Sequence, residues 1–182
     1  MMVENEPTYS QDEVISQITS FYEFLATLYL PKSEIKYPPA EGWPGITTES
    51  MAFMKKDDTV IELLRHLPYI RRDMEYEPYQ IHERTTAVDY TGKQFWGPAG
   101  IRIPMYDNAA PFEEWTTLPA YVVTLATISE GRDGYHFLLD TKRGVISMCD
   151  FMIGPRATKL SLVSVYRAVF VDNRSSEAES PC

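Results

Sequence analysis

The side chains best suited to catalysis in this chain are three histidines and one internal cysteine. His66, His82 and His136 fall at a predicted helix end, just before a predicted strand and on a strand. None of them has a metal-ligand spacing to another histidine or to a cysteine, so no zinc site is predicted. Cys149 lies inside an apolar strand-like run. A thiol nucleophile would need one of these histidines beside it, whereas inert packing is the commoner role of such a cysteine.

Other combinations of reactive side chains are weaker still. His82 and Glu83 are adjacent, and neighbours on a strand point to opposite faces of a sheet, so they would not share a site. Asp140 and Asp150 flank a predicted hairpin and could form an acidic pair, although aspartates at strand ends more often accept hydrogen bonds from turn amides. The glycines at 97–100 precede a strand and lack the lysine of a phosphate loop. The sequence therefore predicts no catalytic residue, no metal and no cofactor.

Aromatic residues in loops point instead to protein binding. Trp43 lies in the run 35–48, which is rich in proline and glycine, and Trp115 follows two glutamates in the long connection 96–118. Large rigid rings supply contact area at an interface, and neighbouring acids select a basic partner. The alternative is that each tryptophan fills its own domain's core from a loop. The predicted protein-binding residues are Glu41, Trp43, Tyr106, Glu113, Glu114 and Trp115.

Composition and charge narrow the class of partner. The chain has 182 residues, of which 44% are hydrophobic, and this is the size and composition of one folded domain. Its net charge is −9, and residues 1–60 hold 10 acids against 4 bases. Such a field favours a basic protein partner and repels nucleic acid. The alternative is that the acidity serves solubility alone.

The sequence also carries signals about its compartment. The N-terminus is acidic where a secretory signal would be basic, and the apolar windows 121–128 and 160–171 are too short to span a bilayer. The two cysteines, Cys149 and Cys182, do not suggest a disulfide framework. We therefore expect a cytoplasmic protein without a membrane partner, and the nucleus stays open as an alternative.

The first 70 residues carry helix signals. Ser10 to Glu13 reads as a capping box, and Pro31 ends the helix that follows. The predicted stripe of this helix, expected to pack on a sheet, is Val14, Ile18, Phe21, Leu25 and Leu28, flanked by Ile15, Tyr22 and Tyr29. The run 35–48 should be an irregular loop because of its prolines and glycines. Thr47 or Thr48 could cap a short helix through Met54, and Asp57 or Asp58 could cap another that Pro68 stops.

The remainder of the chain reads as strands separated by turns. The predicted strands are 85–90, 100–103, 121–128, 135–140 and 145–150, and the last two form a hairpin around Gly144. Residues 160–171 are taken as a further strand, although a helix fits nearly as well. The expected fold class is α+β, with N-terminal helices packed on a mostly antiparallel sheet. One domain is expected over 1–172, followed by a polar tail at 173–182.

The hairpin segment from Gly134 to Met148 resembles the SUKH superfamily. In that group a glycine-bearing strand ending in aspartate precedes a glycine turn and another strand, and Gly134, Asp140 and Gly144 match the pattern. The stretches 37–47 and 63–70 are similar to those of proteins from filamentous fungi. The superfamily includes the yeast cell-wall assembly regulator and many bacterial toxin-immunity proteins. The resemblance implies an α/β fold used for protein binding and transfers no catalytic residue to this chain.

Three hypotheses about function follow from the sequence. The leading one is a non-enzymatic, SUKH-like interaction domain with a regulatory or scaffolding role, whose acidic surface engages another protein. The alternative is a small-molecule-binding protein or enzyme with a pocket between sheet and helices, with His82, His136 or Cys149 at its mouth. The third is a structural subunit that hides the N-terminal helix stripe in a homodimer. The oligomeric state is left open.

Overall fold

A computed structural model describes residues 9–72, 79–92, 118–129, 134–150 and 159–161. Two helices, α1 (Gln11–Leu28) and α2 (Asp58–His66), precede an antiparallel sheet, which confirms the α+β class. The predicted strand 100–103 and the predicted tail 173–182 lie outside the described residues, as do four of the six predicted binding residues, namely Tyr106, Glu113, Glu114 and Trp115.

Helix α1 begins where its cap predicts but buries a different stripe. The Ser10 side chain accepts a hydrogen bond from the Glu13 amide at 3.4 Å. The buried residues are Val14, Ile18, Tyr22 and Leu25. The prediction that Leu28 belongs to the packing stripe is wrong, because Leu28 is 60% exposed. Phe21 is half-buried and packs against the edge of the core. The predicted stripe and the observed set of buried residues both fit a helical period of 3.6 residues. The element that packs on α1, and not the hydropathy pattern, therefore decides which set is buried.

Helix α2 follows its predicted cap closely. The Asp57 side chain accepts from the Val60 amide at 3.1 Å, and the helix ends just before Leu67 and Pro68. The short helix predicted through Met54 is only a single 3-10 turn, η2 (Ala52–Met54). A second 3-10 turn, η1 (Lys32–Glu34), follows α1.

One part of the run 35–48 is more regular than predicted. Strand β1 (Ile35–Lys36) pairs antiparallel with β2 (Tyr69–Ile70), so the prediction that the whole run is irregular is wrong at its start. The two residues of β1 precede the prolines at 38 and 39, so both of their amides remain available for pairing.

The main sheet has six antiparallel strands in the order β3-β4-β5-β6-β7-β8. Their bounds are β3 (Gln80–His82), β4 (Thr85–Ala87), β5 (Val122–Ile128), β6 (Tyr135–Asp140), β7 (Val145–Asp150) and β8 (Lys159–Ser161). The β6–β7 hairpin is confirmed in full register, and Gly144 in its turn has a φ of 63°. Strand β4 is shorter than the predicted 85–90, and the predicted strand 160–171 is described only where it overlaps β8. Strand β3 was not predicted.

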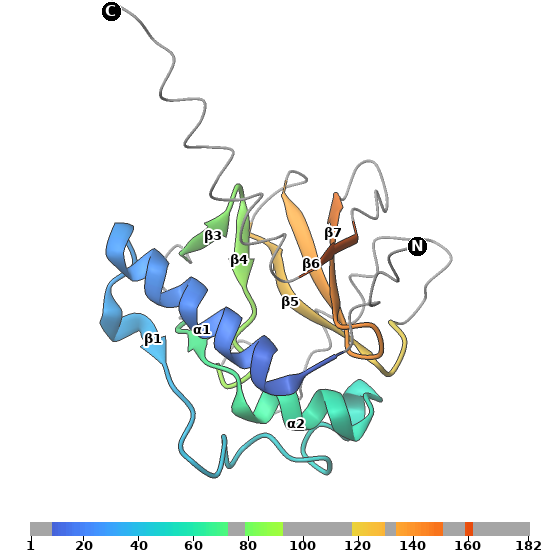
Figure 1. Ribbon diagram of the computed structural model, residues 1–182. Coiled ribbons are helices and arrows are strands. Elements are labelled where there is room, and N and C mark those ends of the chain that lie inside the picture. The colour runs from blue at the N-terminus through green and yellow to red at the C-terminus, as the bar shows by residue number, and fades with distance from the viewer. Residues whose placement is uncertain (1–8, 73–78, 93–117, 130–133, 151–158, 162–182) are drawn as a thin grey trace, which may run out of the picture.

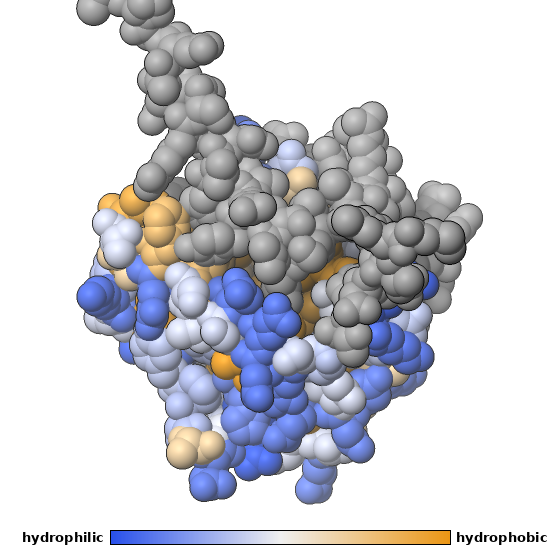
Figure 2. All heavy atoms as spheres, in the orientation of Figure 1, coloured by the Kyte–Doolittle hydropathy of each residue, from blue (hydrophilic) through white to orange (hydrophobic). Residues whose placement is uncertain are grey.

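Helix α1 lies across one face of this sheet, with α2 beside it at the lower edge in Figure 1. One large hydrophobic cluster joins both helices to that face, including Leu25, Leu64, Phe137 and Leu139. Leu138 points to the other face because it alternates with its neighbours, and there it packs in a second cluster with Leu118, Val122 and Cys149. Figure 2 views the side of the molecule on which α1 and α2 lie, here called the helical side. This side is largely hydrophilic, apart from an apolar area near the C-terminal end of α1.

Within the ranges given above, none of the helices has the length and apolar character needed to cross a membrane.

Candidate functional site

A hollow of about 460 Å³ lies between helix α2 and the loop that follows Trp43. The residues that line it are Ile46, Thr47, Thr48, Asp58, Ile61, Glu62 and Arg65. The four from α2 are spaced i, i+3, i+4 and i+7, so they form one stripe along the helix. Ile46 and Ile61 are buried and form its apolar floor, whereas Thr47, Thr48, Asp58 and Glu62 are exposed.

The loop is held against the end of α2 by backbone contacts. The Trp43 amide donates to the Arg65 carbonyl at 2.8 Å, and the Ile46 amide donates to the Trp43 carbonyl at 3.0 Å. Gly42 has a φ of 75°, and a Cβ atom there would lie 2.6 Å from Cγ of Arg65. Only glycine combines this left-handed backbone with so close an approach. The chain therefore fixes the near end of the hollow at Gly42.

The far end of the loop is fixed by its own side chains. The Ser50 amide donates to Oγ1 of Thr47 at 3.0 Å, and the Thr47 amide donates to Oγ of Ser50 at 2.8 Å. The Ser50 hydroxyl also donates to the Gly45 carbonyl at 2.9 Å. These reciprocal bonds satisfy the loop's polar groups locally, so the wall of the hollow is ordered before anything binds.

The polar rim of the hollow is acidic at one end and mixed at the other. The Thr48 hydroxyl donates to Oδ1 of Asp58 at 3.2 Å. Further along the helix, Oε2 of Glu62 lies 3.9 Å from Nη1 of Arg65, and Oε1 of Glu62 lies 3.3 Å from Nδ1 of His66. The lining thus offers carboxylate, hydroxyl and guanidinium groups, which can recognise a polar group through hydrogen bonds and charge.

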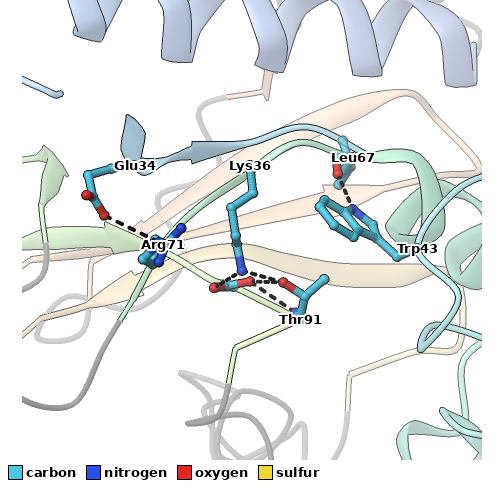
Figure 3. Close-up of polar contacts among 7 residues, drawn as sticks. Glu34, Lys36, Trp43, Leu67, Arg71 and Thr91 are labelled. Carbon is cyan, nitrogen blue, oxygen red and sulfur yellow. Dashed lines mark hydrogen bonds and ion pairs between the residues drawn. The ribbon is translucent and has the colours of Figure 1, made fainter. Parts of the chain in front are cut away.

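The structure places two of the predicted binding residues, Glu41 and Trp43, just before this loop, and neither of them lines the hollow. Glu41 is exposed beside Gly42. Trp43 is half-buried: its indole Nε1 donates to the Leu67 carbonyl at 2.8 Å (Figure 3), and its ring centroid lies 6.0 Å from that of Tyr69. Trp43 thus packs on its own domain. Contact of either residue with a partner stays a prediction.

A buried ion pair close to this loop was missed by sequence reasoning. Nζ of Lys36 lies 2.6 Å from Oδ2 of Asp89, whose side chain is 1% exposed. Lys36 also donates to the Thr91 hydroxyl, which in turn donates to Oδ1 of Asp89 at 2.7 Å (Figure 3). The pair ties β1 to the segment after β4. The available signal was a single acid in the apolar run 87–90, which requires a partner if buried.

The three residues of the alternative enzyme hypothesis, His82, His136 and Cys149, do not converge on one site. His136 and Cys149 are direct cross-strand partners on β6 and β7, and Nδ1 of His136 lies 3.2 Å from Oγ1 of Thr127. The His82 ring instead packs against Tyr135 and Phe137, with centroids at 5.0 and 5.7 Å. Because Tyr135 and Phe137 alternate with His136 along β6, His82 lies on the opposite face of the sheet.

The His136–Cys149 pair has the wrong protonation states for an activated thiolate. Burial raises the pKa of the Cys149 thiol to about 11 and lowers the pKa of His136 from its usual value. At neutral pH both groups are therefore uncharged, and the Cys149 side chain is only 2% exposed. Reactive cysteines need a lowered pKa and access to solvent. In the part of the chain that the structure describes, no three potential ligands from histidine, cysteine, aspartate and glutamate gather to hold a metal.

We expect Cys149 to react slowly with thiol reagents in the native protein. A pKa near 11 leaves at least about a hundredfold less thiolate at pH 8 than an ordinary cysteine has, and burial limits access further. The measurement is the alkylation rate by iodoacetamide in a Cys182→Ser variant, native and in denaturant. The control is His136→Gln, which should leave the native rate low. Rapid native alkylation that His136→Gln slows would instead reveal an activated pair.

Comparison with protein-family models, with curated proteins and with solved structures finds no match for this chain. The residues behind the SUKH resemblance occupy defined places in the hairpin. Gly134 directly precedes β6, Asp140 ends that strand, and the Gly144 amide donates to the Asp140 carbonyl at 2.9 Å. Asp140 also accepts from the amides of Lys142 and Arg143. This aspartate therefore organises the turn, as is usual for aspartates at strand ends.

Proposed function

We propose that this chain is a non-enzymatic, SUKH-like interaction domain that binds a basic protein partner through its helical side. The observation that carries the proposal is the ordered hollow between α2 and the loop after Trp43, with its apolar floor and its acidic rim. Interfaces combine an apolar centre with polar groups that select the partner. The hollow offers this combination on a small scale.

The distribution of charge supports a basic partner. Asp58 and Glu62 line the hollow, Glu41 and Glu49 are exposed in the adjoining loop, and the chain carries a net charge of −9. Opposite charge speeds the encounter of two proteins and disfavours wrong partners. We further propose a cytoplasmic location and a regulatory or scaffolding role, to which the hollow contributes a surface for recognition.

Order in the unbound state supports the proposal as well. The loop is fixed at both ends, by Gly42 and Trp43 against α2 and by the reciprocal Thr47–Ser50 bonds. Binding to a wall that is already ordered avoids the entropy cost of ordering it at the moment of association. The hairpin pattern of Gly134, Asp140 and Gly144 is what favours the SUKH superfamily.

The test compares two double variants. Each replaces two acids with their neutral amides, so the two variants have the same net charge. Purified wild type is cross-linked in an extract of its source cells, and bound proteins are quantified beside Asp58→Asn/Glu62→Gln and Glu13→Gln/Glu83→Gln. All four residues are exposed acids, but Glu13, at the start of α1, and Glu83, in the β3–β4 turn, do not line the hollow. We expect basic partners to fall at least fivefold with the first variant only, and to weaken between 50 and 300 mM salt.

Two results would contradict the proposal. If both variants reduce the same partners equally, general acidity and not this surface determines binding. If neither variant reduces any basic partner while both remain folded, the helical side is not the binding surface.

A further inference from the structure

From the shape and charge of the hollow we infer that it receives a single lysine or arginine side chain, the anchor of the partner. The inference rests on the proposed function, because it names the chemistry by which the same surface would recognise its partner. The occupant has an aliphatic stem and a cationic head. Each of these two parts has a matching region in the hollow.

The floor matches the aliphatic stem. Ile46, from the loop, and Ile61, from α2, both line the hollow and are 1% and 4% exposed. Lysine and arginine bury their methylene groups on apolar surface while their charged ends stay near water. A volume of about 460 Å³ accommodates one long side chain together with some water.

The rim matches the cationic head at one end only. Asp58 accepts one hydrogen bond, through Oδ1 from the Thr48 hydroxyl at 3.2 Å, and its carboxylate is exposed. Arg65 lies at the other end of the hollow, seven residues along α2. Its guanidinium is 3.9 Å from the Glu62 carboxylate, which offsets its charge in part. Glu62 lies between Arg65 and Asp58, one helical turn from Asp58, and is paired with Arg65.

The orientation of the occupant follows from these positions. The head lies beside the exposed carboxylate of Asp58, which keeps its bond from Thr48, and the stem runs over Ile61 toward the loop. A neutral side chain of the same length would keep the contact with the floor but lose the charge interaction. The site therefore distinguishes arginine from its uncharged isostere citrulline.

The experiment titrates the labelled full chain with small probes and follows its amide signals by NMR. The probes are the N-acetyl methylamides of arginine, lysine, citrulline and norleucine. We expect saturable shifts at residues 46–48 and 58–65 with the two cationic probes, with Kd on the order of 1 mM. Citrulline and norleucine should bind at least fivefold more weakly. Asp58→Asn keeps the shape and the Thr48 contact, because Asp57 and not Asp58 caps α2, and it should weaken arginine binding about fivefold.

A matched variant and two outcomes complete the test. Glu49→Gln removes an exposed acid of the same loop that does not line the hollow, and should leave the Kd within about twofold. Equal binding of citrulline and arginine, or no saturable shift up to 50 mM, would overturn the inference. If the probes fail while Asp58→Asn/Glu62→Gln still loses protein partners, the inference about the side chain fails alone and the proposed function stands. If the probes bind but no partner depends on the hollow, the proposed function fails, and only the affinity of the hollow for a cationic side chain remains.

Discussion

Replacing Lys36 with methionine should destabilise the protein by about 3 kcal/mol, because the change leaves the Asp89 carboxylate buried without its counter-ion. The Asp89 side chain is 1% exposed, whereas the Lys36 side chain is 21% exposed. The amide and hydroxyl of Thr91 continue to donate to Asp89, at 3.0 and 2.7 Å, but neither carries a charge. Urea unfolding of wild type and Lys36→Met measures the difference.

A double variant separates the ion pair from simple packing. Lys36→Met/Asp89→Leu removes both charges and should recover much of the stability lost in the single variant, because replacing both partners of a buried pair is often close to neutral. A single-variant loss below about 1 kcal/mol would show that the pair contributes no more than an exposed one. A double variant as unstable as Lys36→Met would assign the loss to side-chain packing.

The elements that sequence analysis located correctly are those whose signals are local. The caps at Ser10 and Asp57 are each read from a few consecutive residues, and the β6–β7 hairpin from a strand, a turn and a strand. The stripe of α1 was misjudged because its face depends on the sheet that covers it. Strands β1 and β2 join residues 35 apart in the chain, at Ile35 and Ile70, and each has only two residues. No local pattern distinguishes such a strand from a loop.

The candidate site was predictable only in part, for the same reason. The sequence marked Glu41 and Trp43, because proline, glycine and a large ring coincide there, and these residues adjoin the hollow without lining it. It did not mark Asp58 and Glu62, because an acid on an amphipathic helix ordinarily faces solvent. Their place in the hollow depends on which face of α2 the loop covers, and that is decided by the contact of Gly42 with Arg65. The Lys36–Asp89 pair is likewise non-local, since 53 residues separate its members.

Trp43→Ala should lower the free energy of unfolding by about 2–4 kcal/mol. This is less than the loss of about 3–5 kcal/mol typical of fully buried tryptophans, because the Trp43 side chain is half-buried. The change removes the ring contact with Tyr69 and leaves the Leu67 carbonyl without the indole donor. Urea unfolding measures the loss. The amide signals of residues 46–48 should shift as well, because the indole ring anchors the start of the loop to Leu67 and Tyr69.

The matched control, Trp43→Phe, keeps an aromatic ring and loses only the indole donor, which should cost about 1 kcal/mol. This comparison also decides what the tryptophan does for binding. If Trp43 positions the loop, Trp43→Phe should retain the partners that Trp43→Ala loses, because the hollow keeps its wall. If instead Trp43→Ala costs less than about 1 kcal/mol and both variants lose the same partners, the ring contacts the partner directly. Trp43→Ala could lose its partners because the loop is displaced or because a direct contact is removed. The free energy of unfolding separates these two causes, so stability and binding must be measured on the same pair of variants.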